Sequence, residues 1–441
     1  MTPKEIKEFK PYAWRTPAEM PAALDRARAR MEKVGVWSEN QMLGRRYSIG
    51  CVALEITQRC NLDCTLCYLS EHSEEVKDIP IEEIYRRIDQ IKNSFGPGTD
   101  VQITGGDPTL RNRQELMDIV RRVRELGMKP TLMTNGLKAT RDVLEELVEA
   151  GLHDVAFHVD LTQERRPFKT EMELNKVRQI YIDRCRGLPI HVLFNTTVYE
   201  GNFHEIPDLI RFFRKNADVV GFASFQLQAD TGRGVLRERA NVISADTVWE
   251  KIQEGAGIPL VYDAIQVGHR DCNRWTSTLA VNGNLHSFVD NPDFVTEFLN
   301  KTTELEFTRH TPVQTVAKIL AWMTKHPALL KDGIAHILPR IWKMKKDLIA
   351  ARGKVNKLTF FIHNFMDAKG LDCDRIDSCS FMAMTPDGPI SMCMHNAKRD
   401  EFILKPFEVT TEEGKKIWNP LTGQTEAMQA SAGPKKESLK V

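Results

Sequence analysis

The chain has 441 residues, an apolar content of 41% and a net charge of +1. This length suits one large α/β domain with smaller additions, and the composition excludes a fibrous or largely disordered chain. The first residues are charged and no apolar run reaches the roughly 18 residues of a membrane span, so we expect a cytoplasmic protein. Nine cysteines without a secretion signal favour metal or thiol chemistry over disulfides.

Six β-like runs alternate with helical patterns between residue 51 and about residue 228, which predicts βα units and a parallel sheet. The predicted strands are 51–57, 100–106, 129–136, 154–160, 190–198 and 219–227. The predicted helices are 81–94, 112–127, 140–151, 172–186 and 204–215. In a barrel of such units the loops after the strands build the active site, and the motifs described next lie in those loops.

Three cysteines, Cys60, Cys64 and Cys67, follow the first predicted strand with the spacing CxxxCxxC. A structural zinc site or a closed iron–sulfur cluster takes four protein ligands. Three close cysteines without a fourth Cys or His beside them therefore favour a metal site with one open position. A zinc knuckle and a set of buried free thiols are the alternatives.

The cysteine motif resembles the signature of radical S-adenosylmethionine (SAM) enzymes. The resemblance implies a partial (β/α)6 TIM-like barrel and a [4Fe-4S] cluster on Cys60, Cys64 and Cys67, with SAM bound at the fourth iron. It also implies a 5′-deoxyadenosyl radical that abstracts hydrogen from an unactivated carbon, in a site that excludes water and oxygen. The electron would come from a flavodoxin or a ferredoxin.

The stretch Gly105, Gly106, Asp107, Pro108 and Thr109 follows the second predicted strand. It resembles the GGEP motif of the same family, whose backbone receives the amino group of SAM. Two glycines allow close backbone approach because they carry no Cβ. Asp107 stands where Glu is usual, which keeps the carboxylate with a shorter reach. A simple turn is the alternative interpretation.

Further candidate SAM contacts lie next to the third cysteine and after the later strands. Leu66 precedes Cys67, where the family often packs an aromatic side chain against the adenine, and Tyr68 follows it. The polar candidates after the third to sixth strands are Asn135, Asp160, Asn195 and Gln228, each of which is otherwise a turn former. Arg233 is a candidate for binding the SAM carboxylate or an anionic substrate, with a solvated surface arginine as the alternative.

A second group of cysteines lies beyond the predicted barrel. Cys272, Cys373, Cys379 and Cys393 have the number of thiolates that closes an auxiliary [4Fe-4S] cluster or a zinc site, and dispersed free thiols are the alternative. Cys51 and Cys185 are interpreted as packed thiols.

The segments HRDCNRW and FMDAKGLDCDRIDSCSFMAMTPDGPISMCMHN resemble the C-terminal half of one radical SAM group. That group contains proteins related to archaeal tetraether lipid synthase and to hydroxymethylpterin methyltransferases, and the resemblance covers roughly residues 50–400. The group carries an additional cysteine-rich N-terminal segment, whereas residues 1–50 contain no cysteine. We therefore expect fewer clusters in this chain.

Residues 313–357 contain ten Lys or Arg and two Asp, a net charge of +8, interleaved with large apolar residues. This pattern predicts helices with an apolar and a basic face, broken at Pro327 and Pro339, as in helices that lie on a membrane surface. A helical hairpin packed on the barrel is the alternative. Nucleic-acid binding is disfavoured because aromatic residues are few and no RNA-binding motif is present.

The sequence predicts six regions: an N-terminal extension (1–50), the α/β core barrel (51–260), a connecting segment with Cys272 (261–312), the basic arm (313–357), the auxiliary-cluster region (358–410) and a tail (411–441) that is disordered from about residue 424.

The expected function is hydrogen abstraction from a membrane-lipid hydrocarbon chain, with carbon–carbon bond formation as one outcome, at the inner face of the membrane. One alternative is a radical SAM enzyme that modifies a peptide or small molecule and carries a SPASM- or twitch-like auxiliary cluster. The other alternative is a non-catalytic binding protein whose fold is stabilised by a bound metal.

Overall fold

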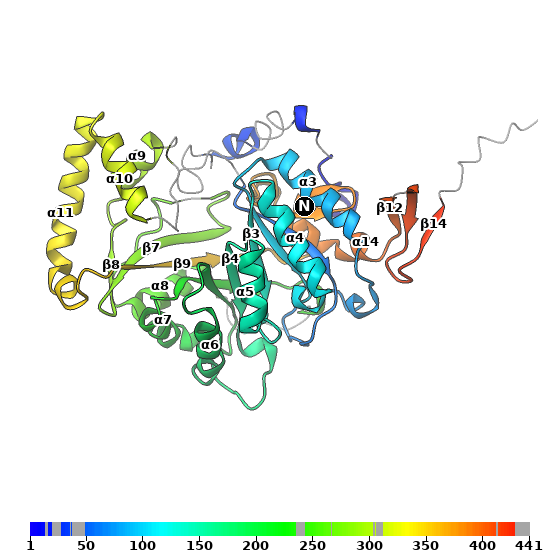
Figure 1. Cartoon of the computed structure of the whole chain (residues 1–441), viewed down its shortest axis with the longest axis horizontal. Coiled ribbons are helices and arrows are strands. Elements are labelled where there is room, and N and C mark those ends of the chain that lie inside the picture. Colours follow the sequence, from blue (N-terminus) through cyan, green and yellow to red (C-terminus); the bar gives the residue numbers. More distant parts are fainter. Residues whose placement is uncertain are drawn as a thin grey trace, which may run out of the picture.

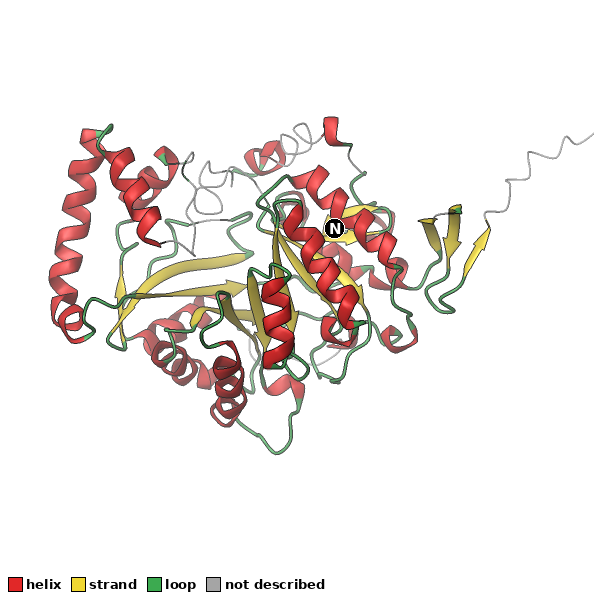
Figure 2. Ribbon diagram, in the orientation of Figure 1, coloured by secondary structure: helices red, strands yellow, loops and turns green. Residues whose placement is uncertain are grey.

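The computed structural model describes residues 1–13, 16–19, 28–35, 37, 49–234, 243–265, 267–302, 305, 312–411 and 413–427. Within these ranges an eleven-stranded sheet forms the centre of the molecule, in the order β11-β10-β1-β2-β3-β4-β5-β6-β9-β7-β8 (Figures 1 and 2). A smaller sheet, β12-β13-β14, lies at one end of the molecule.

The strands of the large sheet are β1 Cys51–Thr57, β2 Asp100–Gly105, β3 Lys129–Thr134, β4 Asp154–His158, β5 His191–Val198, β6 Val220–Leu227, β7 Asn273–Val281, β8 Asn284–Ser287, β9 Asn356–His363, β10 Phe381–Thr385 and β11 Gly388–Ser391. The small sheet contains β12 Phe407–Thr411, β13 Gly414–Trp418 and β14 Thr425–Ala427.

The helices are α1 Pro3–Glu8, α3 Ile81–Phe95, α4 Arg113–Glu125, α5 Arg141–Glu149, α6 Glu171–Cys185, α7 Ile206–Lys215, α8 Ala245–Ala256, α9 Pro292–Lys301, α10 Pro312–Met323, α11 Pro327–Ala350, α12 Cys373–Asp377, α13 Met392–Ala397 and α14 Arg399–Ile403. Helices α3 to α7 alternate with the strands. Their apolar faces pack against the sheet and form one continuous hydrophobic core with it.

The predicted α/β fold with parallel βα units is confirmed. Strands β1 to β6 are parallel and neighbour one another in chain order. The predicted strand and helix ends agree with the structure to within two residues, the ordinary uncertainty of such boundaries.

The sheet extends beyond the six predicted units. Strand β9 pairs in parallel with β6, and β10 pairs in parallel with β1, so the region predicted as a separate auxiliary segment contributes to the main sheet. The sequence missed this because neither strand belongs to a regular βα alternation. The two ends of the curled sheet approach each other, and the Ser380 hydroxyl before β10 donates to the carbonyl of Val267 ahead of β7 (3.4 Å).

The basic arm forms two helices, α10 and α11, and α11 packs against the β7–β8 hairpin. The predicted break at Pro339 is wrong, because α11 continues through it. Proline removes one backbone donor and frees the carbonyl four residues earlier, at Ala335. Both residues are exposed, so water can satisfy that carbonyl. Within the described residues, no helix is both long enough and apolar enough to cross a membrane.

Residues near the N-terminus contact the region around β11 and α13. The backbone N–H of Tyr12 donates to Pro389 in β11, and Lys398 donates to the carbonyls of Lys7 and Phe9 (2.7 and 2.9 Å). The tail predicted to be disordered from about residue 424 instead begins with β14, which pairs with β13. The rest of that prediction, residues 428–441, lies outside the described residues.

Candidate active site

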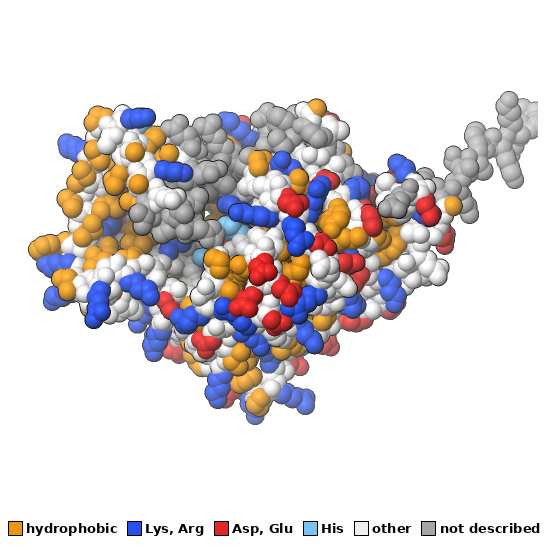
Figure 3. All heavy atoms as spheres, in the orientation of Figure 1, with side chains coloured by type: hydrophobic (Ala, Val, Ile, Leu, Met, Phe, Trp, Pro, Cys, Tyr) orange, Lys and Arg blue, Asp and Glu red, His pale blue; other side chains and the backbone are white. Residues whose placement is uncertain are grey.

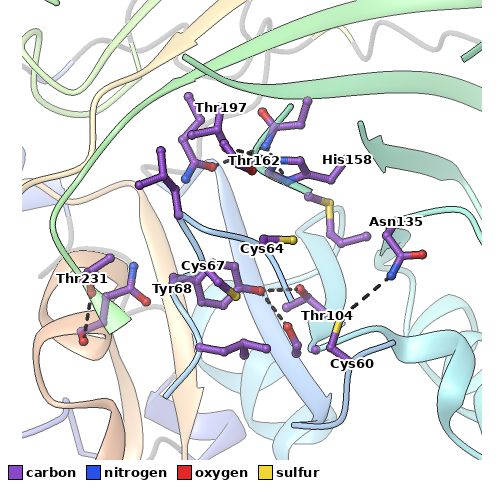
Figure 4. A pocket seen from close by; sticks show the side chains of 18 of the residues that line it. Cys60, Cys64, Cys67, Tyr68, Thr104, Asn135, His158, Thr162, Thr197 and Thr231 are labelled. Atoms are coloured by element: carbon purple, nitrogen blue, oxygen red, sulfur yellow. Dashed lines mark hydrogen bonds between the residues drawn. The ribbon is translucent and has the colours of Figure 1, made fainter. Parts of the chain in front are cut away.

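The loop that follows β1 carries Cys60, Cys64 and Cys67 at the C-terminal end of the parallel strands. All three side chains line one cavity, and Figure 4 shows them around it. Asn135, after β3, lies with Nδ2 3.9 Å from Cys60 Sγ and donates to the side chain of Asn61 (2.7 Å). The structure thus brings the predicted triad together at the edge where the sequence places it.

The electrostatics of the triad favour a bound positive charge, such as a metal ion. Burial raises the pKa of all three thiols, and the charges of Cys67 and Cys60 raise that of Cys64 further because they lie close to it. A metal bound to a thiol deprotonates it outright. The donor set therefore fits an iron–sulfur cluster, whose irons would convert the three thiols into thiolates.

Gly105 and Gly106 let the turn after β2 pack directly on the cysteine loop. A Cβ on Gly105, whose φ is +129°, would lie 1.9 Å from the Thr57 carbonyl oxygen, and one on Gly106 would lie 2.0 Å from that of Arg59. The N–H groups of Gly106 and Asp107 donate to the same two carbonyls (3.0 and 2.8 Å). Both glycines also line the cavity. The two glycines thus allow close packing within the chain, and their contact with SAM stays a prediction.

Asp107 is predicted as a SAM-binding residue because it belongs to the motif whose backbone would receive the amino group. Asp107 is fully buried and does not line the cavity. Its carboxylate accepts hydrogen bonds from the N–H and hydroxyl of Thr109 (3.0 and 2.5 Å), the hydroxyl of Thr134 (2.9 Å) and the N–H of Asn135 (2.8 Å). Pro108 and Thr109 form a short turn outside the cavity lining. The carboxylate of Asp107 thus positions Asn135.

Asp160 also has a positioning role rather than the predicted contact. It is buried outside the cavity lining and accepts from His158 Nε2 (2.6 Å), the Thr162 N–H (2.9 Å) and the Thr197 N–H (2.7 Å). Burial by itself would raise the pKa of Asp160, but the charge and hydrogen bond of His158, with the bonds from Thr162 and Thr197, hold the pKa well below its usual range.

Arg233 does not reach the cavity that the three cysteines line. It forms ion pairs with Asp63 (3.1 Å) and Glu74 (3.2 Å) and donates to the carbonyl of Ser70 (3.0 Å). Arg233 thus holds the outer side of the cysteine loop and borders a separate pocket with Cys60, and its anion binding stays a prediction.

Five of the predicted SAM contacts line the cavity besides the two glycines: Leu66, Tyr68, Asn135, Asn195 and Gln228. The hydroxyl of Tyr68 donates to the Gly105 carbonyl (2.8 Å), which fixes the ring beside Cys67.

Several polar residues of the cavity were missed from the sequence, among them Thr104, His158, Thr162, Thr197 and Gln226. His158 lies 3.1 Å from the Thr197 hydroxyl, and its Nδ1 lies 3.4 Å from Asn195 Nδ2. The alternation of side chains along a strand carries the signal, because residues two apart share a face. In the predicted strand 154–160, His158 shares a face with Asp160. The sequence pattern led to Asp160, not His158, as the predicted SAM contact.

Three of the four cysteines of the second group line another cavity: Cys272, Cys379 and Cys393. Arg375 Nε donates to Cys272 Sγ (3.3 Å), and the Met366 N–H donates to Cys393 Sγ (3.5 Å).

Cys373 does not join the other three. It begins α12, is exposed and does not line their cavity. The predicted four-cysteine set is therefore not brought together. Across the described part of the chain, no three His, Cys, Asp or Glu side chains converge closely enough to hold a single metal ion.

The two cavities are adjacent. They share the lining residues Gln102, Met133, Asn195, Gln226, Phe365, Phe381 and Met392. The triad and the second cysteine group therefore open onto neighbouring parts of the interior of the curled sheet.

Comparisons with known proteins match residues 54–213 to the model of the radical SAM superfamily. The chain is 25% identical to 7,8-dihydro-6-hydroxymethylpterin dimethyltransferase of Methanocaldococcus jannaschii, over 82% of this chain and 80% of that protein. It is 34% identical to a probable GTP 3′,8-cyclase of Pyrococcus abyssi, over 37% of this chain and 52% of that protein, so it spans about half of that relative.

Among solved structures, the chain is similar to Streptococcus suis SuiB bound to its precursor peptide SuiA. The TM-score is 0.38 at 17% identity, covering 54% of this chain and 50% of that one.

Proposed function

Because the chain belongs to the radical SAM superfamily, we propose that this enzyme abstracts hydrogen from a carbon of a membrane-lipid hydrocarbon chain. Family membership implies a [4Fe-4S] cluster and SAM, which together supply homolytic cleavage of SAM and hydrogen abstraction from an unactivated carbon. The observation that most supports radical SAM chemistry is that Cys60, Cys64 and Cys67 share a cavity with side chains from β1 to β6. A flavodoxin or a ferredoxin is the proposed electron donor.

The residues of the cavity have separable tasks in this proposal. The three cysteines hold the cluster. Asn135 and Gln228 offer hydrogen bonds to the polar groups of SAM, and so do His158 and Asn195, while Leu66 and the ring of Tyr68 offer apolar contact for the adenine. Because these side chains come from rigid strand ends and from a loop fixed by Asp107, they hold SAM in one orientation.

Large apolar side chains in the second cavity support a hydrocarbon substrate. The second cavity is bordered by the large side chains Leu193, Phe222, Trp275, Phe361, Phe365, Phe381 and Met392. Trp275 lies edge-on to both Phe222 and Phe361, with ring centroids 5.9 and 5.6 Å apart. These side chains offer apolar contact to a lipid chain, and polar side chains such as Gln102, Asp154 and His363 border the same cavity.

The helices of the basic arm support access to a membrane. Ile334, Ile337, Leu338, Ile341 and Trp342 lie three and four residues apart on α11, and all are exposed, Trp342 by 69%. The opposite face of α11 is the one that packs on the protein, through Leu329, Gly333, His336 and Met344. Hydrophobic and basic side chains are interspersed over α10 and α11 in Figure 3. An apolar stripe flanked by lysines matches a helix that lies on anionic lipid.

Vesicle flotation tests the membrane contact. The triple variant Ile337→Ser, Ile341→Ser and Trp342→Ser removes exposed apolar area while sparing the packed face of α11. Ile180→Ser, at an exposed position on α6, is the matched control. We expect wild type and the control to float with vesicles rich in phosphatidylglycerol and the triple variant to stay at the bottom. Equal flotation of all three, or of none, would remove the support for a membrane role.

A polar small molecule, such as a reduced pterin, is the second candidate substrate. The side chains of Gln102, Asn195 and Gln226 lie where the two cavities meet, and they offer amide donors and acceptors to a heterocycle. The relative that acts on a hydroxymethylpterin, by its name, covers most of this chain.

The central reaction is tested with anaerobically reconstituted, reduced protein and SAM. Wild type and Cys373→Ala should form 5′-deoxyadenosine, and the variant with Cys60, Cys64 and Cys67 all changed to Ala should form none. Product from the triple variant would contradict the assignment, and bound zinc without any SAM cleavage would favour a non-catalytic binding protein.

Deuterium transfer identifies the substrate. Lipid vesicles with perdeuterated hydrocarbon chains should place deuterium in 5′-deoxyadenosine. Transfer from a deuterated dihydropterin in place of the lipid would favour the second candidate.

A further inference from the structure

We propose that residues 136–140 and 163–169, the two basic loops beside the cysteine loop, form a docking surface for an acidic one-electron carrier protein such as a flavodoxin. The electron would enter on the Cys60 side of the triad. The inference rests on the proposed function in one respect, because it requires a cluster at the triad that accepts an electron. It holds for a lipid and for a pterin substrate alike.

Cys60 borders two spaces. It lines the cavity shared with Cys64 and Cys67, and it also borders the separate pocket on the outer side of the cysteine loop, next to Asn61 and Leu62. Electron transfer slows steeply with distance, so a carrier protein must bind where the triad lies close to the outside of the molecule. The Cys60 side of the cysteine loop offers such a place.

Hydrogen bonds join the basic loops to the residues around Cys60. Asn135, which precedes the first basic loop, donates from Nδ2 to the side chain of Asn61 (2.7 Å), and the same atom lies 3.9 Å from Cys60 Sγ (Figure 4). Arg165, in the second basic loop, donates to the carbonyl of Asn135 (2.5 Å) and to the hydroxyl of Tyr181 (2.8 Å). A protein bound to these loops therefore lies beside Cys60.

The basic loops carry an excess of positive charge. They contain four cations, Lys138, Arg165, Arg166 and Lys169, and one carboxylate, Glu164, which gives a net charge of +3. The whole chain has a net charge of only +1, so this excess is a local feature. Lys138, Arg166 and Lys169 are exposed, and none of them forms an ion pair with another described residue. Their charges are therefore available to an acidic partner, which they would attract over several ångströms.

The opposite side of the cysteine loop is acidic. Asp63, Glu71 and Glu74 border the outer pocket, and Arg233 pairs with two of them. An acidic carrier is attracted to one side of the loop and repelled from the other, which fixes its orientation. A broad anionic surface, such as a membrane, would meet both sides at once. The division of charge therefore favours a protein partner of limited contact area.

The proposed transfer involves one electron. The carrier is oxidised by one electron, and the cluster on the triad is reduced by one. SAM then takes up this electron at its sulfonium, and its C5′–S bond breaks to give methionine and the 5′-deoxyadenosyl radical. The side chains of the basic loops take no part in this chemistry, so their role is to bind the carrier.

Carrier binding tests the surface directly, with full-length reconstituted protein and a purified acidic flavodoxin as the probe. The variant with Lys138→Glu, Arg166→Glu and Lys169→Glu should raise the Kd about tenfold at low salt, and the difference should shrink at about 0.5 M salt. The matched control makes the same change of charge at three exposed lysines outside these loops, with Lys10→Glu, Lys215→Glu and Lys369→Glu. Its Kd should stay within about twofold of wild type.

Unchanged carrier binding by the loop variant would overturn the inference, and so would an equal weakening in the control, which would show an effect of net charge alone. Loss of flotation on anionic vesicles in the loop variant, with carrier binding intact, would assign the basic loops to a lipid surface instead.

Two reductants separate docking from chemistry. With reduced flavodoxin the loop variant should form 5′-deoxyadenosine about tenfold more slowly than wild type, and with dithionite, which needs no docking surface, it should match wild type. An equal loss with both reductants would show that the loops act on the triad itself and would contradict the inference. Wild type that forms no product even with dithionite would contradict the proposed function, while the Kd values would still decide the docking surface.

Discussion

Arg399, in the last helix before the small sheet, donates from Nη1 to both carboxylate oxygens of Glu55, at 2.8 and 2.9 Å. Both side chains are buried. The Arg399 guanidinium carbon also lies 4.7 Å from the centroid of the Tyr68 ring, and Tyr68 is bonded to Gly105. The C-terminal region therefore supports the cysteine loop through β1, although more than 300 residues separate them in the chain.

The Glu55–Arg399 pair predicts a pH-dependent stability. Burial alone would raise the pKa of Glu55, but Arg399, His395 and Gln58 outweigh it and lower the pKa from 4.5 to about 2. A depressed pKa in the folded state contributes stability above the unfolded value, about pH 4.5, and this contribution is lost as the pH falls toward 2. Glu55→Gln should therefore cost about 3 kcal/mol at pH 7 and much less at pH 3.

Urea denaturation of wild type and Glu55→Gln at the two pH values measures this difference. Glu413→Gln is the matched control, because its pair with Lys416 is exposed and should change the urea midpoint little. The same loss in Glu55→Gln at pH 7 and at pH 3 would show that the ion pair is not responsible.

Gly106→Ala should prevent assembly of the cluster at the triad. Its Cβ would lie 2.0 Å from the Arg59 carbonyl, so the root of the cysteine loop must move. Gly370→Ala is the control, because its Cβ meets nothing within 4 Å and its backbone is not in the left-handed region. Reconstituted Gly106→Ala should lose the iron that the triad holds in wild type and form no 5′-deoxyadenosine. Full iron content in Gly106→Ala would show that the loop adapts.

The sequence predicted most of what depends on local pattern. Alternating runs located β1 to β6, and the spacing of Cys60, Cys64 and Cys67 located the triad in the loop after β1. It could not show that β10 returns beside β1, because that pairing joins residues more than 300 positions apart. For the same reason it included Cys373 with Cys272, Cys379 and Cys393, whereas Cys373 lies outside the cavity that the other three line.

Side-chain direction was the second limit. Asp107 is a candidate for SAM contact because its motif resembles that of the family, and Asp160 and Arg233 are candidates because they follow predicted strands. In the structure their charges are satisfied by neighbouring parts of the chain. A sequence pattern places a residue at the edge of a sheet, but it does not say whether its side chain faces the cavity or the adjacent loop.

Asp107→Asn should destabilise the protein more than removal of one of its donors. One carboxylate oxygen accepts from Thr109 and the other from the N–H of Asn135, so an amide must turn its NH₂ toward one of these donors. We expect a loss of about 2–3 kcal/mol for Asp107→Asn and about 1 kcal/mol for Thr134→Val, which removes a single hydroxyl. Urea midpoints measure both, and an equal loss in the two variants would contradict the role of the carboxylate.

His158 should contribute directly to SAM binding, and His153, the residue before the same strand, supplies a control. His158 Nε2 is held by Asp160, which leaves the other ring nitrogen beside Asn195 in the cavity. His153, at the other end of this unit, is likewise paired with an aspartate, Asp154 at 3.0 Å, but does not line the SAM cavity. His158→Ala should weaken SAM binding about tenfold, the loss expected for one hydrogen bond, and His153→Ala should leave it within about twofold. Equilibrium dialysis of reconstituted protein with labelled SAM measures both. An equal weakening would mean that the histidines act through the stability of the sheet, while no change in His158→Ala would remove His158 from the binding site.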